Sequence, residues 1–247
     1  MNLKNIIKKT KLLIRDPREF CRTASRSIRP VPQPYRRNFR MNLRQWLLYH
    51  HKNVVFTKTS WMGVRTLKNP FDAWIYQEII YEVKPDVIIE IGSAEGGSTL
   101  YFANLLDIIC KGRVLSIEID RSNYKVRHDR IVELTGDCLA PETIRKAADL
   151  CRNKTVMAIH DGDHNKGHVL EDLRAYSSLV SVGSYFIVED GIVDLFRPGD
   201  GIRGAYRDGP LAAVEEFLKE NRSFVADTAR ERYLLTYNPK GFLRRVC

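Results

Sequence analysis

Three acidic side chains and a histidine follow two apolar runs of this chain, in an order that can support chemistry. Asp161 and His164 come after one run, and Glu189 and Asp190 come directly after the next. If both runs are parallel strands, their carboxyl ends meet at one edge of a sheet, where α/β proteins bind ligands. Carboxylate oxygens that converge there suit a hard divalent cation such as Mg²⁺.

A cation at this edge would bind a substrate hydroxyl, lower its pKa and orient it as a nucleophile. His164 lies three residues after Asp161, and the ordinary pKa of imidazole suits a general base. We therefore predict that Asp161, Glu189 and Asp190 hold the metal. His164 and Asp161 are the predicted catalytic residues.

The loop at residues 90–98 is a second candidate site. It follows the apolar Val87-Ile88-Ile89 and contains Gly92, Gly96 and Gly97, which let a backbone turn tightly and approach a ligand. Its spacing matches neither a P-loop nor the Gly-x-Gly-x-x-Gly pattern of dinucleotide binders. A nucleoside-like cofactor without a pyrophosphate fits better, and S-adenosylmethionine is the leading candidate.

An acid at the end of the next strand is the expected partner of the cofactor ribose. Glu118 lies 26 residues after Gly92, in a position where a carboxylate commonly accepts hydrogen bonds from ribose hydroxyls. Asp120 is two positions further on and competes for this role. The alternative is that Glu118 is a solvated acid at a strand end without a ligand.

Other interpretations of the histidine-rich segment stay open at this point. His160 is expected to line the pocket, and Asp163 is a candidate cap of the following helix. His164 and His168, four residues apart, have the spacing of a zinc pair on a helix. Two histidines with one carboxylate are also similar to a non-haem iron site.

The rest of the chain supplies elements that would position these residues. Strands alternating with helices predict an α/β fold with a parallel sheet and a two-stranded addition at one edge. Residues 42–81 are expected to be mostly helical. The expected later helices are 72–83, 97–109, 141–151, 167–180 and 210–220. The expected strands are 87–89, 114–119, 131–134, 156–160, 185–188, one near Phe224, and Leu234–Tyr237.

The positive charge is concentrated in the first 60 residues, which hold 15 Lys and Arg against 2 Asp and Glu. We predict a basic N-terminal extension over 1–60 and a catalytic domain over 61–247. Residues 1–29 have the pattern of a basic amphipathic helix, which can bind an anionic membrane surface. A solvated tail, or a helix packed on a partner subunit, is the interpretation favoured over membrane contact. Nucleic acid is not an expected partner, since the remaining chain is slightly acidic.

No apolar run is long enough to span a bilayer, and no secretory signal is expected. The five cysteines form no Cys-x-x-Cys pair, which favours reduced thiols. These features predict a cytoplasmic protein, or one bound peripherally at the inner face of the membrane. They leave the oligomeric state open, a homo-oligomer included.

The segment 197–204 is rich in glycine and follows the predicted metal ligands. We expect it to be mobile and to close over the acceptor, or else to be a plain surface loop. Arg203 and Arg207 are candidates to bind an anionic acceptor.

From about Trp61 to Arg245 the chain resembles the cephalosporin hydroxylase and rhamnosyl O-methyltransferase family, which are metal-dependent class I methyltransferases. The marks of the resemblance lie in every part of that region. They are Lys68-x-Pro70-x-Asp72-x-Trp74-x-Tyr76-Gln77-Glu78, Lys84-Pro85-Asp86, the 90–98 loop, Asp161-x-x-His164, His168-Val169, Glu189-Asp190, Gly209-Pro210, Arg230-Glu231 and Asn238-Pro239-x-Gly241-Phe242-Leu243.

The resemblance implies a seven-stranded Rossmann-like sheet whose last strand is antiparallel. It implies a metal at Asp161, Glu189 and Asp190, with His164 as the base. It implies contacts to S-adenosylmethionine from Glu90, Gly92, Ser93, Gly96, Gly97, Ser98, Glu118 and Asp137.

The predicted activity is a metal-dependent transfer of methyl from S-adenosylmethionine to a hydroxyl. The expected acceptor is a sugar in a glycan, glycolipid or natural product. The alternatives are a non-haem iron hydroxylase and a non-catalytic nucleoside-binding subunit of an envelope glycan assembly.

Overall fold

The computed structural model describes residues 40–197, 200 and 208–247. The basic segment 1–29, Arg203, Arg207 and most of the glycine-rich segment 197–204 lie outside the described residues. Within the described part, no helix is long and apolar enough to cross a membrane.

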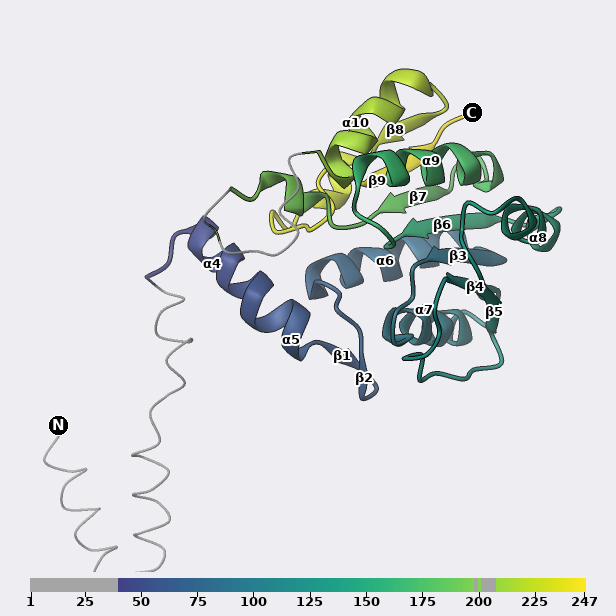
Figure 1. Ribbon diagram of the computed structural model, residues 1–247, viewed down its shortest axis with the longest axis horizontal. Coiled ribbons are helices and arrows are strands. Elements are labelled where there is room, and N and C mark those ends of the chain that lie inside the picture. The colour runs from purple at the N-terminus through teal and green to yellow at the C-terminus, as the bar shows by residue number, and fades with distance from the viewer. Residues whose placement is uncertain (1–39, 198–199, 201–207) are drawn as a thin grey trace, which may run out of the picture. The chain divides into compact units, whose positions relative to one another are not determined.

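Seven strands form one sheet in the order β5-β4-β3-β6-β7-β9-β8 (Figure 1). Neighbours from β5 to β7 pair in parallel, whereas β9 pairs antiparallel with both β7 and β8. The prediction of a seven-stranded α/β sheet with its last strand antiparallel is confirmed. The strands are β3 (Val87–Ile91), β4 (Arg113–Glu118), β5 (Ile131–Thr135), β6 (Val156–His160), β7 (Tyr185–Val188), β8 (Phe224–Ala226) and β9 (Phe242–Arg245).

Helices cover both faces of the sheet, as Figure 1 shows. Alternate strand residues face opposite sides, so β3 places Ile89 in one core and Ile88 in the other. The first core packs against α8 (Pro141–Cys151), α9 (Lys166–Tyr176) and α10 (Pro210–Glu220). The second packs against α6 (Pro70–Val83) and α7 (Gly97–Ile108).

The segment expected to be helical over 42–81 contains an additional hairpin. Helical turns in α4 (Leu43–His50), η1 (His51–Val55) and α5 (Phe56–Lys58) precede the short strands β1 (Ser60–Trp61) and β2 (Val64–Arg65). Met62 and Gly63 join these strands with φ angles of 48° and 83°. Positive φ at both central residues is typical of a tight hairpin turn. Met-Gly is a weak signal for such a turn, so the hairpin was not predicted, although most of residues 42–81 is helical as expected.

The prediction of a last strand at Leu234–Tyr237 is wrong, because the last strand is β9, which begins at Phe242. Leu234 is 81% exposed with a φ of 63°. The Tyr237 backbone N–H is directed into the core, where it donates to Asp72 Oδ2 over 2.8 Å. The predicted helix 167–180 ends earlier, at Tyr176, and a 3₁₀ turn follows at η2 (Ser177–Leu179). Two further 3₁₀ turns are η3 (Gly191–Leu195) and η4 (Thr228–Glu231).

The chain divides into two compact units, one ending at Leu47 and the other running from Leu48 to Cys247. In the larger unit, His50 Nδ1 lies 3.1 Å from the Tyr237 hydroxyl, and the His51 ring packs on Phe196. Residues just before 61 therefore contact the body. The boundary at residues 60 and 61 stays a prediction.

Candidate active site

The carboxyl ends of β3, β4 and β6 surround one cavity. The glycine loop after β3 forms much of its wall, together with residues 65–67, which lead from β2 toward α6. Of the predicted site residues, the cavity is lined by Gly92, Ser93, Gly97, Ser98, Glu118 and Asp161. The cavity therefore brings the predicted cofactor loop and one predicted metal ligand together.

Two glycines allow backbone segments to come close to each other at this edge. Gly92 has a φ of +82°, and a Cβ there would lie 2.2 Å from the carbonyl oxygen of Asp161. A Cβ on Gly97 would lie 2.1 Å from the carbonyl oxygen of Arg65. A larger residue at Gly92 must push the loop away from the segment after β6, and one at Gly97 must push the start of α7 away from β2. Glycine at position 92 is thus required for the contact between the loop and the metal side of the site.

Glu118 faces the glycine loop directly. Its Oε2 accepts hydrogen bonds from the backbone N–H groups of Ser93 and Ala94, each over 2.8 Å. Asp120 lines the same cavity, but its carboxylate accepts from the backbone N–H and the hydroxyl of Ser122. Of the two acids, Glu118 is therefore the one that is hydrogen-bonded to the loop.

The other three predicted cofactor residues are not among the described residues that line this cavity. Glu90 is fully buried and accepts from the Thr99 hydroxyl, and burial raises the pKa of its carboxyl to about 7. Gly96 caps α7 with a φ of 88° and lies against Tyr124. Asp137 is exposed, and its carboxylate accepts from the Leu139 N–H. Cofactor contact at these three positions stays a prediction.

The predicted metal ligands converge at the ends of β6 and β7. Donor atoms of Asp161, His164 and Asp190 all lie within 4.8 Å of one another. His164 Nε2 is 3.0 Å from Asp190 Oδ2. Glu189 joins the group through Lys68, whose ammonium contacts Asp161 and lies 2.8 Å from Glu189 Oε2.

Lys68 is the site residue that sequence reasoning missed. It appears in the sequence only as one mark of the family pattern, and nothing around it signals burial. Its side chain is nevertheless 3% exposed. Burial lowers the pKa of Lys68, but the charges of Asp161 and Glu189 outweigh burial and raise that pKa above its usual range.

His164 is charged in this arrangement. Burial lowers its pKa, but the hydrogen bond to Asp190 and the charges of Asp190 and Asp161 raise it to about 9. An imidazole with that pKa is protonated at neutral pH, so it becomes a base only when the negative charge beside it is reduced.

The donor set fits Mg²⁺. Asp161, Glu189 and Asp190 offer carboxylate oxygens from adjacent strand ends, and the described residues give the buried Glu189 Oε1 no hydrogen-bond partner. Hard oxygen ligands with room for waters are what Mg²⁺ prefers. The assignment of these three ligands stays a prediction.

One expectation about the neighbouring residues is wrong, and two of the alternative interpretations are not supported. His160 does not line the cavity: it is 1% exposed, and its Nε2 lies 3.0 Å from Asp172 Oδ2. Asn165 caps α9 in place of Asp163, because its side chain accepts from the Gly167 N–H. His168 does not pair with His164. Its Nε2 lies 3.6 Å from Cys138 Sγ, in a separate cluster.

Comparison with known proteins agrees with this geometry. A model of the Rhamnosyl O-methyltransferase/CmcI family matches residues 53–246. The rhamnosyl O-methyltransferase of Mycobacterium leprae is 33% identical over 205 residues, covering 80% of this chain and 87% of that protein. Its counterpart from Mycobacterium tuberculosis is 32% identical over 206 residues, covering 80% and 82%.

Solved structures of CmcI have the same fold. One, described with Mg and SAM, has a TM-score of 0.61 and 27% identity, and covers 78% of each chain. Another, with SAH, has a TM-score of 0.58 and 25% identity, covering 78% of this chain and 84% of that one. These relatives bear out the predicted cofactors, S-adenosylmethionine and Mg²⁺. The chain belongs to the Rhamnosyl O-methyltransferase/CmcI family and is, as predicted, an S-adenosylmethionine-dependent O-methyltransferase.

Proposed function

We propose that this protein transfers the methyl group of S-adenosylmethionine to a hydroxyl of a sugar in a glycan, glycolipid or natural product. One observation carries the proposal: Asp161 lines the cavity of the glycine loop and also belongs to the cluster with His164 and Asp190. The methyl donor and the metal group thus share a side chain. The acceptor class is supported by relatives named for rhamnosyl methylation.

Asp161, Glu189 and Asp190 are the residues that would hold Mg²⁺. When bound, the cation polarises the acceptor hydroxyl and lowers its pKa. Glu118 and the backbone of the 92–98 loop hold the cofactor against the same strand ends. The main contribution of the protein is the in-line alignment of acceptor oxygen, methyl carbon and sulfur.

His164 is the group that accepts the proton. Once the charges of Asp161 and Asp190 are neutralised, the pKa of His164 falls from about 9 toward its ordinary value, and Nε2 becomes basic. As the acceptor oxygen loses its proton to His164, an oxygen–carbon bond forms and the sulfur–carbon bond breaks. S-adenosylhomocysteine is left. The His164 side chain is 27% exposed, so the proton can leave to solvent.

An iron hydroxylase is the less favoured function. A two-histidine, one-carboxylate site needs two imidazoles beside the acid. Among the described residues, His164 lies at the acid cluster, whereas His160 contacts Asp172. Three carboxylates with one histidine favour Mg²⁺ over iron.

The test is a turnover assay with the full chain, S-adenosylmethionine and Mg²⁺, offered rhamnosyl, glucosyl and galactosyl glycosides. We expect a methylated glycoside, detected by mass spectrometry, with equimolar S-adenosylhomocysteine. Asp161→Asn should lose more than about 100-fold in rate, because a cation supplies several kcal/mol of charge stabilisation. Asp149→Asn, on the exposed face of α8, should keep full activity.

Each other outcome contradicts a stated part of the proposal. Tight S-adenosylmethionine binding without turnover of any glycoside would reject the sugar acceptor. Full activity after chelation of the metal would reject Mg²⁺ dependence. Product that gains oxygen in place of a methyl group would favour the hydroxylase.

Membrane attachment through residues 1–29 also stays a proposal, supported by their basic and apolar pattern. Sedimentation with anionic vesicles tests it, with a chain lacking residues 1–29 as the control. Binding by both chains, or by neither, would reject it.

A further inference from the structure

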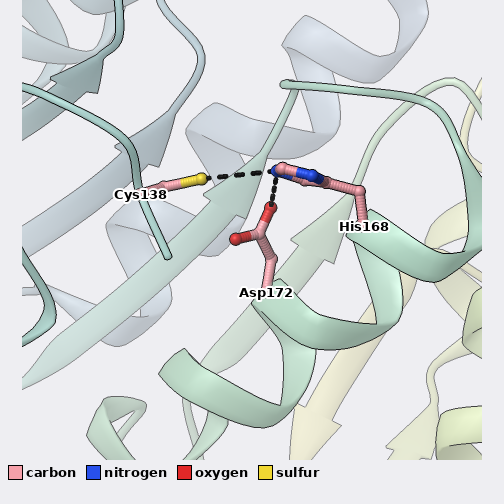
Figure 2. A group of neighbouring side chains, drawn as sticks. All are labelled: Cys138, His168 and Asp172. Carbon is pink, nitrogen blue, oxygen red and sulfur yellow. Dashed lines mark hydrogen bonds and ion pairs between the residues drawn. The ribbon is translucent and has the colours of Figure 1, made fainter. Parts of the chain in front are cut away.

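We propose that Cys138, His168 and Asp172 form a second metal site, suited to Zn²⁺ and separate from the acid cluster. Cys138 follows β5, and the other two residues lie one turn apart on α9. Figure 2 shows the thiol and the carboxylate directed at the same imidazole nitrogen. The donor atoms of all three lie within 4.8 Å of one another.

The separations fit a tetrahedral ion. Zinc–ligand bonds of about 2.0–2.3 Å place neighbouring ligand atoms roughly 3.3–3.6 Å apart. Cys138 Sγ lies 3.6 Å from His168 Nε2, and that nitrogen lies 3.7 Å from Asp172 Oδ2. Small side-chain adjustments would bring all three donors to bonding distance.

Three protein ligands leave one position of a tetrahedral ion for a water, as at zinc sites with three protein ligands. His160 borders the group: it ends β6, and its Nε2 lies 3.0 Å from Asp172 Oδ2. It does not belong to the set of donors that lie within 4.8 Å of one another. The ligands come from two elements, the turn after β5 and α9.

The burial of Asp172 indicates that a cation belongs here. Its side chain is fully buried, and neither carboxylate oxygen has a hydrogen bond of good geometry among the described residues. His160 Nε2 is likewise buried without one. Within the described residues, the ion-pair contacts of Asp172 are with His160 and His168, and none is with Lys or Arg. A buried carboxylate without such partners is costly, and a bound cation would remove that cost.

The ligand types select the metal. Thiolate and imidazole favour zinc and other borderline or soft ions, whereas Mg²⁺ prefers oxygen ligands. The ion has a path from solvent, because the His168 side chain is 33% exposed. Bound there, it would fix the turn that carries Asp137 against α9, and Cys138 would release its thiol proton.

The test uses the full, reduced chain, stripped of metal and titrated with Co²⁺ as a spectroscopic substitute for Zn²⁺. Excess Mg²⁺ is present throughout, so that the acid cluster does not contribute. We expect a thiolate-to-cobalt charge-transfer band that saturates at one equivalent and disappears when Zn²⁺ is added. The band should be lost in Cys138→Ser and retained in Cys110→Ser, which changes an exposed thiol.

A second variant and a second measurement show whether a lost band reflects a lost ligand or a misfolded Cys138→Ser protein. His168→Gln changes a partly exposed side chain, and it should weaken Co²⁺ binding at least about tenfold, as loss of a ligand does. Zn²⁺ should raise the Tm of the wild type and leave that of Cys138→Ser unchanged. Asp161→Asn should keep the band, which separates this site from the proposed catalytic metal.

The proposal is overturned if the wild type shows no thiolate band or no rise in Tm with Zn²⁺. It is also overturned if Cys138→Ser keeps the band, or if Cys110→Ser loses it. In those cases the cluster is a hydrogen-bonded group of buried side chains without a metal.

Discussion

The ammonium of Lys68 lies 2.8 Å from Glu189 Oε2 and also contacts Asp161. These two acids follow the ends of two different strands, β7 and β6. Lys68 itself precedes α6, far from both acids in sequence. A single buried positive charge therefore holds together the carboxylates that we assign to Mg²⁺. Uncompensated, these buried charges would repel one another and lose the solvation of water.

Replacing Lys68 with Met should destabilise the metal-free protein by about 3–5 kcal/mol, because one partner of a buried ion pair is removed. Urea unfolding measures this loss. Added Mg²⁺ should recover part of it by restoring positive charge between the acids. Lys111→Met is the control: its partly exposed pair with Asp86 is worth less than about 1 kcal/mol. Equal effects of the two substitutions would contradict the role given to Lys68.

The raised pKa of His164 predicts a pH-dependent stability of the metal-free protein. Its folded pKa of about 9 exceeds the ordinary 6.5. The stabilisation by His164 is therefore complete below pH 6.5 and is lost as pH rises through 9. The loss is about 3 kcal/mol at most.

Urea unfolding at a series of pH values, compared with His164→Gln, isolates this contribution. The difference in unfolding free energy between the two proteins should shrink as pH rises through that window. Asp190→Asn should lower the pKa of the imidazole, read directly by NMR. His128→Gln removes a pair whose carboxylate, on Asp107, is about half exposed, and it should leave the window unchanged. A constant difference across the range would refute the assignment.

Much of the fold was predictable because its central strands, β3, β6 and β7, are apolar runs buried on both faces. Val87–Ile91 and Val156–His160 are buried at every position, so their sequences show strands without the help of partners. β9 differs. Phe242 and Leu243 are buried while the two following arginines are not, and a strand of four residues carries little periodic signal. The apolar residues near Leu234 were a stronger but misleading pattern.

The same distinction separates the parts of the site. The positions of Asp161, Glu189 and Asp190 at one sheet edge were predictable because each lies within two residues of a strand end, and parallel strands bring their carboxyl ends together. The places of Lys68 and Cys138 depend on contacts between segments distant in sequence. His168 was considered as a partner of His164 because helical spacing is visible in a sequence. The contact of His168 with Cys138, in the turn after β5, is not visible there.

Glu118→Gln should weaken binding of S-adenosylhomocysteine about 10- to 100-fold, measured by calorimetry. The amide oxygen can still accept from the Ser93 and Ala94 N–H groups, so the loop should stay in place. What is lost is the charge that strengthens hydrogen bonds from ribose hydroxyls. Asp120→Asn is the matched control, because Asp120 bonds to Ser122. If Asp120→Asn weakens binding and Glu118→Gln does not, the ribose partner is Asp120.

Gly92→Ala should abolish cofactor binding, and Gly183→Ala should not. Both glycines have a φ of +82°, so both substitutions carry the same backbone cost of about 1 kcal/mol. The difference lies in the space around them. A Cβ at Gly92 would lie 2.2 Å from the Asp161 carbonyl oxygen, whereas nothing lies within 4 Å of one at Gly183. Relief of that clash must separate the glycine loop from the Asp161 strand end. Gly92→Ala should therefore lose more affinity for S-adenosylhomocysteine, measured by calorimetry, and more thermal stability than Gly183→Ala. Equal losses in the two variants would mean that the loop and the Asp161 strand end are not in contact at Gly92.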